Sequence, residues 1–100
     1  MEGRNLIPAT ACCEYYNIEL SFIRSLDQYG FIHIVSEKQN QFIDADELQT
    51  LEKFTRMHYE LDINMEGMEA ISFLLERLEN MKDEIAYLKS KLNVYEHGNN

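Results

Sequence analysis

The sequence predicts a mainly α-helical protein, in which a small head with one β-hairpin is followed by a long C-terminal helix. Three observations support this prediction. Apolar residues recur at alternating steps of three and four along residues 65–95, the spacing of one helix face read in heptads. Two short helical segments come before Gly30, and two β-rich runs follow it around a polar turn. The predicted order is helix, helix, hairpin, helix, long helix.

The first third of the chain predicts two short helices joined by a tight turn. Thr10 is a suitable N-cap for a helix over residues 11–16, which Asn17 would end. A second helix is expected over residues 19–29, with Gly30 at its C-terminal end. Its apolar residues are spaced to share one face: Phe22, Ile23 and Leu26. Two such helices form a helix-turn-helix.

A hairpin is expected next, over residues 31–35 and 41–43 with the turn at 36–40. This is the place of the wing in winged helix-turn-helix domains. Leu6 and Ile7, near the start of the chain, either form a short strand or pack on the head. Asp44 and Glu47 have the spacing of a capping box and open the next helix. That helix carries Leu48, Leu51, Phe54, Thr55, Met57, His58 and Leu61, and residues 62–64 form the loop after it.

The C-terminal helix has one apolar stripe along its length. Its members are Ile71, Leu74, Leu78, Met81, Ile85, Leu88, Leu92 and Tyr95. Phe73 and Leu75 widen the stripe in its first half, so we expect residues 65–78 to dock on the head and residues 81–95 to project toward another helix. Whether the helix breaks near Asn80 is open. The predicted organisation is a head over residues 1–64, a helical segment for docking and dimerisation over 65–96, and a disordered tail over 97–100.

We expect a homodimer, because a projecting apolar seam is stabilised when a second helix covers it. The dimerisation residues would be Met81, Ile85, Leu88, Leu92 and Tyr95. In a parallel pair Glu84 and Lys89 would attract each other, whereas Arg77 and Lys82 would repel. These charges favour an antiparallel pair, or a pairing confined to residues 81–95, and leave the direction open.

The charge distribution argues against a nucleic-acid binder. The formal net charge is −9 over 100 residues. Residues 1–43 hold three basic and five acidic residues, a net charge of −2, and the remaining −7 lies in residues 44–100. Neither part provides the basic surface with which proteins bind phosphates. An acidic surface instead favours basic protein partners.

The remaining composition predicts a cytoplasmic protein that is not an enzyme and has no cofactor. The two cysteines, Cys12 and Cys13, are adjacent and therefore expected to be reduced thiols. No signal peptide and no apolar run of membrane-spanning length is expected. The histidines are His33, His58 and His97, and none has a second metal ligand at helical spacing. No nucleophile elbow, phosphate-binding loop or pair of catalytic carboxylates is present in the sequence.

Two segments resemble the winged-helix head of MerR-type regulators. The run Phe22-Ile23-Arg24-Ser25-Leu26-Asp27-Gln28-Tyr29-Gly30-Phe31-Ile32 is similar to the second helix and the glycine that opens the wing. The run Asn40-Gln41-Phe42-Ile43-Asp44-Ala45-Asp46-Glu47-Leu48 is similar to the return strand of the wing and the next helix cap. Within this superfamily, the acidic and apolar run at residues 60–71 and the leucine-rich end at 88–92 resemble the chaperone-modulator family CbpM.

The CbpM resemblance implies a protein that binds the J-domain of a DnaJ-like co-chaperone and blocks its stimulation of a DnaK-type ATPase. A J-domain presents a basic helix, which an acidic surface would attract. The candidate partner-binding residues are Glu60, Asp62, Met65, Glu66, Met68 and Glu69, with the methionines as the apolar part. For Glu66 and Glu69, the preference for acids in the first turns of a helix is an alternative explanation.

Two departures from the family patterns bear on function. Met65 stands where the chaperone modulators often have Trp. Gln41 stands where DNA-binding MerR proteins usually carry Arg in the wing. Those proteins also have more basic residues in the second helix, where this chain has Glu19, Arg24 and Asp27. The alternative interpretations are a MerR-like DNA-binding transcription regulator and a structural adaptor. The sequence does not say which co-chaperone is bound or which face binds it.

Overall fold

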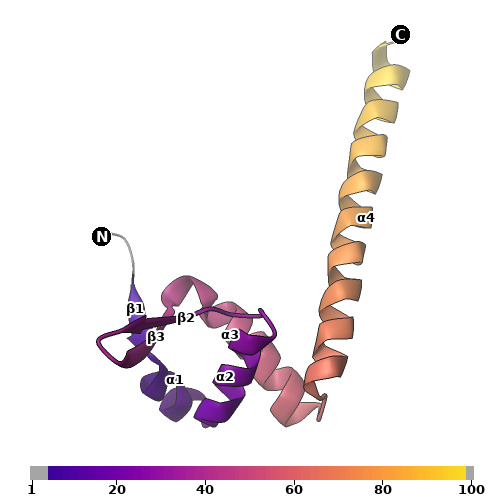
Figure 1. Ribbon diagram of the computed structural model, residues 1–100. Coiled ribbons are helices and arrows are strands. Elements are labelled where there is room, and N and C mark those ends of the chain that lie inside the picture. The colour runs from indigo at the N-terminus through magenta and orange to yellow at the C-terminus, as the bar shows by residue number, and fades with distance from the viewer. Residues whose placement is uncertain (1–4, 99–100) are drawn as a thin grey trace. The chain divides into compact units, whose positions relative to one another are not determined.

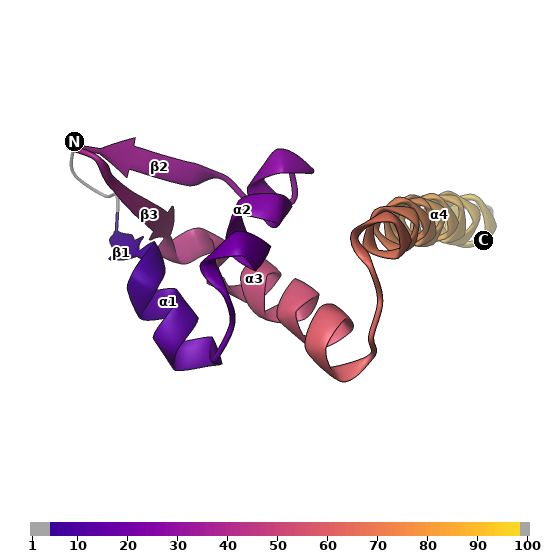
Figure 2. The same ribbon diagram turned by 60° about the horizontal axis from the view of Figure 1, so that its bottom comes forward.

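The structure is a computed structural model that describes residues 5–98, with side chains described for residues 5–94. About 70% of the chain is helical and three strands form a small antiparallel sheet, so the predicted mainly α class is confirmed. The chain divides into two compact units, Met1–Met68, called the head below, and Glu69–Asn100. Figures 1 and 2 show α1, α2 and the strands gathered in the head, with α3 leading away from β3.

Strand β1 (Leu6–Pro8) leads directly into α1 (Ala9–Tyr16). The residue before the helix is Pro8, whose side chain cannot accept a hydrogen bond, and α1 has no side-chain cap. The predicted Thr10 cap is therefore wrong, because the helix begins at Ala9, two residues before the predicted start, and includes Thr10. Asn17 ends α1 as predicted, in the left-handed conformation with φ 57°, which Asn tolerates better than most residues.

Helix α2 (Leu20–Gln28) ends in two reverse hydrogen bonds around Gly30. The N–H of Gly30 donates to the carbonyl of Asp27 at 3.0 Å, and the N–H of Phe31 donates to that of Leu26 at 2.9 Å. This pair of bonds is the Schellman motif, which needs a left-handed residue at its centre. Gly30 has φ +81°, so the predicted role of this glycine is confirmed.

The wing is the hairpin of β2 (Ile34–Glu37) and β3 (Asn40–Asp44). Its turn is two residues long, Lys38 and Gln39, and both have positive φ. That conformation is the type I′ turn, whose twist matches that of the strands. Strand β1 pairs with the other edge of β3, which gives the sheet order β1-β3-β2. The register places Ile43 between Ile7 and Ile34.

The core of the head is formed by one face of α2 packed against residues from the sheet, α3 and the start of α4. Completely buried side chains come from each of these segments: Ile23, Leu26, Ile32, Ile43, Leu51 and Met68. A row of stacked rings extends this core, with Phe31 4.4 Å from Phe54 between centroids. The apolar periodicity of α2 is thus explained by burial of Phe22, Ile23 and Leu26.

A short 3-10 turn (η1, Ala45–Glu47) and α3 (Leu48–Thr55) follow the wing. The Asp44 side chain accepts a hydrogen bond from the backbone N–H of Asp46 at 2.9 Å, so Asp44 is a cap. The predicted capping box is wrong in its second half. Glu47 accepts from the backbone N–H of His33 instead, because the wing passes next to the start of α3.

Helix α3 continues into a π-helical turn (η2, Arg56–Glu60). The wider turn is closed by a bond from the N–H of Leu61 to the carbonyl of Arg56, 3.2 Å long. A π turn contains more residues than an α turn, so it rotates the next side chains about the helix axis. Leu61, which the sequence placed in the apolar series of this helix, is 65% exposed.

Helix α4 (Met65–Gly98) begins in the head and continues through Asn80 without a break. Asn64 caps it by accepting from the backbone N–H of Gly67 at 2.8 Å. A Cβ on Gly67 would lie 2.8 Å from Cγ2 of Ile63 and 3.1 Å from the capping oxygen, which explains the glycine. In the second unit, Phe73 and Leu75 are exposed. None of the helices in the described part of the chain combines the length and the hydrophobicity that a membrane span requires.

Candidate functional site

A groove of about 610 Å³ lies between the start of α1, helix α2 and the wing. Its lining mixes apolar and neutral polar residues with one cation: Pro8, Ala9, Thr10, Leu20, Arg24, Ser36, Gln39, Asn40, Gln41 and Phe42. Arg24 is the one charged residue of this lining. This groove, called the recognition groove below, lies between the helix-turn-helix and the wing.

Few cations surround the groove. Lys38 stands at the tip of the wing and is exposed, but Glu37 precedes it. The exposed acids Glu19 and Asp27 lie at the start and near the end of α2. Each phosphate of a duplex must be neutralised by a basic group to gain affinity from counterion release. Among the described residues, the groove and its surroundings therefore have two cations and three acids. The cations are Arg24 and Lys38, and the acids are Glu19, Asp27 and Glu37.

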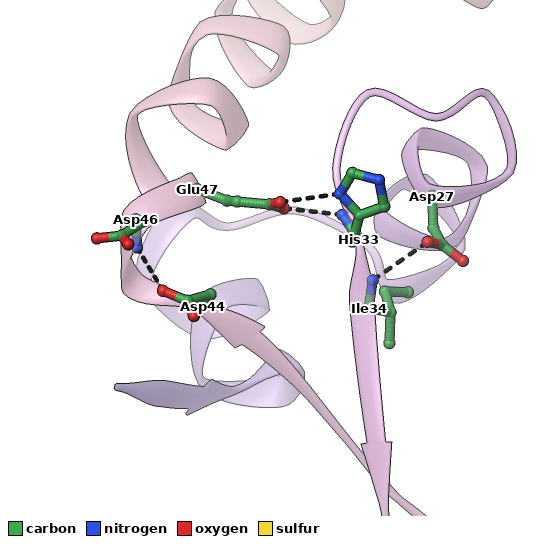
Figure 3. Close-up of polar contacts among 6 residues, drawn as sticks. All are labelled: Asp27, His33, Ile34, Asp44, Asp46 and Glu47. Atoms are coloured by element: carbon green, nitrogen blue, oxygen red, sulfur yellow. Dashed lines mark hydrogen bonds and ion pairs between the residues drawn. The ribbon is translucent and has the colours of Figure 1, made fainter. Parts of the chain in front are cut away.

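The wing is held to the helices by two acidic side chains (Figure 3). Asp27 in α2 accepts a hydrogen bond from the backbone N–H of Ile34 at 3.1 Å. Glu47 accepts from the backbone N–H of His33 at 2.8 Å and lies 3.0 Å from Nδ1 of the same residue. Because a carboxylate only accepts, Nδ1 must carry a proton. Both bonds fix the start of β2, so they orient the wing relative to the groove.

The His33 ring is exposed, and its contact with Glu47 is electrostatic. The hydrogen bond to Glu47, and then the charge of that carboxylate, raise the pKa of His33 above its usual value. The network of Asp27, His33 and Glu47 was not predicted from the sequence. The spacing of Glu47 was noticed there, but it was assigned to a helix cap.

The predicted partner-binding residues do not form one exposed patch. Glu60 and Asp62 are exposed on either side of Leu61, and Met65 is partly buried. Met68 is completely buried, so its predicted role as an exposed apolar anchor is wrong. The reason is that the first turn of α4 belongs to the core of the head.

The two remaining candidates on α4 are both exposed. Glu66 accepts a hydrogen bond from the Tyr29 hydroxyl at 3.1 Å. Glu69 is the first residue of the second unit. Each acid is therefore reachable by solvent, and Glu66 also has a structural contact in the head.

Four of the five predicted dimerisation residues lie on one stripe of α4 with side chains that are half exposed. The exposed fractions of Met81, Ile85, Leu88 and Leu92 are 51–56%. Tyr95 belongs to the helix, but its side chain is outside the described residues. The stripe is therefore an apolar surface available for another helix.

The histidines and cysteines do not form a site for a metal in the described part of the chain. There, no group of three or more His, Cys, Asp or Glu side chains could hold a metal ion. His58 donates from Nδ1 to the carbonyl of Ile63 at 3.1 Å and stacks on Phe22. His97 lies outside the residues whose side chains are described. Burial, and then the neighbouring Cys13, raises the pKa of the Cys12 thiol, which makes this residue a weak nucleophile.

A comparison with protein families agrees with this fold. The family described as MerR HTH family regulatory protein matches residues 7–90, which include the helix-turn-helix, the wing and most of α4. The chain belongs to the MerR HTH family. Comparisons with curated proteins and with solved structures found no match. The family membership confirms the MerR-like head, and it does not distinguish the chaperone modulators from the DNA-binding regulators.

Proposed function

We propose that this MerR-family protein is a non-enzymatic cytoplasmic modulator that binds the J-domain of a DnaJ-like co-chaperone. By occupying the J-domain it would block stimulation of a DnaK-type ATPase. The proposal rests on the resemblance of residues 60–71 and 88–92 to the CbpM family. The observation that carries it is the charge of the head, which suits a basic protein partner better than a phosphate backbone.

The acidic charge of the head is concentrated outside the recognition groove. Residues 44–68 hold seven acidic and two basic residues, a net charge of −5. One of the two bases, Arg56, is paired with Glu60 at 3.8 Å. A surface of this sign increases the association rate with a basic partner and repels nucleic acid.

Glu60 and Asp62 remain the proposed steering residues for the partner. Both are exposed, and the turn between them is held by several backbone bonds. Glu66 and Glu69 extend the acidic sequence into α4, and Met65 offers part of its side chain. Charge alone contributes more to the association rate than to affinity, so an apolar contact must complete the interface.

Titration calorimetry against a J-domain from the same organism tests the proposal. We expect saturable binding that weakens as salt is raised from about 0.05 to 0.5 M, because exposed charges are screened. The same concentrations of protein should lower J-domain-stimulated ATP hydrolysis. The absence of both heat and inhibition would reject the proposed function.

One observation favours the second candidate, a DNA-binding transcription regulator. The groove contains Arg24, hydroxyl and amide side chains, and no carboxylate. A duplex could use such a lining if basic groups elsewhere compensated for the acidic head. A mobility-shift titration at low salt should then show binding that Arg24→Ala abolishes, whereas a flat titration would exclude it.

We also propose that the protein is a homodimer joined through α4. The stripe of Met81, Ile85, Leu88 and Leu92 has heptad spacing and half-exposed side chains. Such a seam is stabilised when a second copy covers it. Neither a cofactor nor a membrane is part of the proposed activity.

A further inference from the structure

A second cavity of the head shares no lining residue with the recognition groove. It has a volume of about 490 Å³ and is lined by Ile7, Ala11, Cys12, Tyr15, Tyr16 and Leu48. Pockets that bind ligands commonly have volumes of about 300–1,000 Å³ and mostly apolar walls. The walls here come from β1, α1 and the start of α3, which are labelled in Figure 2.

This cavity is called the tyrosine pocket below. Its aromatic wall is open to solvent on the side of Tyr15. Tyr15 is 83% exposed, although Tyr16 beside it is partly buried. The two rings meet edge to face, with centroids 4.9 Å apart. Cys12 forms a floor that is only 2% exposed. Tyr15 contributes little to the core of the head, so its ring is available for contact with another molecule.

The charges around the tyrosine pocket have one dominant sign. No Lys or Arg is present in β1, in α1 or in η1. The exposed acids Asp46 and Glu52 flank Leu48 in the sequence. The charge of Glu52 raises the pKa of the Tyr16 hydroxyl, second only to burial, so this carboxylate is close to the pocket. The one basic residue of α3 is Lys53, whose ammonium lies 5.1 Å from the centroid of the Phe54 ring.

These features select the chemistry of the occupant. Apolar walls and an open tyrosine ring suit an aliphatic side chain, and tyrosine faces also attract Lys and Arg. The acidic surroundings attract a basic segment and repel an acidic one. A basic amphipathic helix has both properties, because it carries apolar and cationic side chains on neighbouring positions.

We infer that the tyrosine pocket is the docking site for a basic amphipathic helix, whose apolar side chain enters between Tyr15 and Leu48 while its cations face Glu52. This inference rests on the proposed function, under which that helix belongs to the J-domain. The tyrosine pocket would then supply the apolar contact that Met68 cannot make, because Met68 is completely buried. The acids Glu60 and Asp62 then steer the partner without contacting its apolar side chain.

Calorimetry of single variants of the full chain with the same J-domain tests the inference. Tyr15→Ala should weaken binding by at least about tenfold, as truncation of a central interface tyrosine does. Tyr15→Phe keeps the ring and should bind within about twofold of the native protein. The matched control is Leu61→Ala, since Leu61 is also an exposed apolar residue of the head but lies outside the pocket. This control should bind like the native protein.

The outcomes separate the inference from the proposed function. If the native protein does not bind the J-domain, both the proposed function and this choice of partner are rejected. If it binds and Tyr15→Ala binds equally well, only the tyrosine pocket is rejected. Loss of binding in Leu61→Ala alone would place the apolar contact at the π turn and also overturn the inference. Sedimentation of Tyr15→Ala completes the test, because a lower mass would show that a second copy occupies the pocket. Circular dichroism of each variant checks that it is folded.

Discussion

At the scale of single residues, the contact of His33 with Glu47 links the wing to the protonation state of the protein. The pKa of His33 is raised in the folded protein, chiefly by the hydrogen bond to Glu47 and then by the carboxylate charge. A histidine whose pKa is raised by folding adds to the free energy of unfolding. This stabilisation is fully present below the unfolded pKa of about 6.5 and is lost as pH rises through the folded pKa. The wing is therefore held more firmly in mildly acidic solution.

Glu47→Gln removes the carboxylate charge but keeps a side-chain acceptor for the backbone N–H of His33. We expect this change to lower the pKa of His33 toward its ordinary value, which nuclear magnetic resonance of the ring protons would measure. The stability lost in the variant should be larger at pH 5 than at pH 8. The effect is small because the His33 side chain is 76% exposed, and solvent screens exposed pairs. An unchanged pKa would mean that the Glu47 contact does not form in solution.

Asp44 and Glu47 show why side-chain partners were harder to predict than helices. Their spacing fits a capping box, and Asp44 does cap. Glu47 bonds to His33, fourteen positions earlier, because the hairpin returns the chain to that place. Such a choice depends on tertiary structure, and the local pattern contains no sign of it.

At the scale of elements, the end of α2 depends on Gly30. Gly30 has φ +81°. Holding a residue with a Cβ in this conformation costs about 1 kcal/mol of free energy. A Cβ built at this position would meet nothing within 4 Å, so the cost is confined to the backbone. Gly30→Ala should therefore lower the free energy of unfolding by about 1 kcal/mol, and urea denaturation would measure it.

Gly30→Asn is the matched control, since Asn tolerates the left-handed conformation better than Ala does. It should lose less stability than Gly30→Ala. Equal losses in the two variants would point to a steric cause and contradict the backbone argument.

The C-terminal ends of α1 and α2 followed from local chemistry, whereas the start of α1 and the direction of side chains after the π turn did not. Asn17 and Gly30 end helices because each adopts a left-handed conformation. Leu61 continues the apolar series of α3 in sequence, yet it is 65% exposed. Helical periodicity assumes 3.6 residues per turn, and the wider turn at Arg56–Glu60 breaks that assumption.

At the scale of the whole molecule, the sequence was sufficient for the order of elements but not for the candidate site. Periodicity and turn residues predicted the helices and the hairpin, while β1 was one of two alternatives for Leu6 and Ile7. The tyrosine pocket joins residues from three separate segments, so no local pattern indicates it. Met68 shows the opposite error, because an apolar residue next to acids was expected on the surface and instead completes the core.

The assembly of two chains is the last property that the sequence predicts, and it concerns α4 alone. Ile85→Asp together with Leu88→Asp places two charges on the apolar stripe, where burial against a second helix would leave them without partners. We expect sedimentation to show a mass of two chains for the native protein and of one chain for this variant. Ser90→Asp with Asn93→Asp is the matched control, because it adds the same charge at helix positions that point away from the stripe. That variant should remain dimeric.

Two outcomes would contradict this prediction. An unchanged mass in the Ile85 and Leu88 variant would show that the seam is assigned to the wrong face. Loss of the dimer in the control would show that net charge, and not apolar burial, governs association.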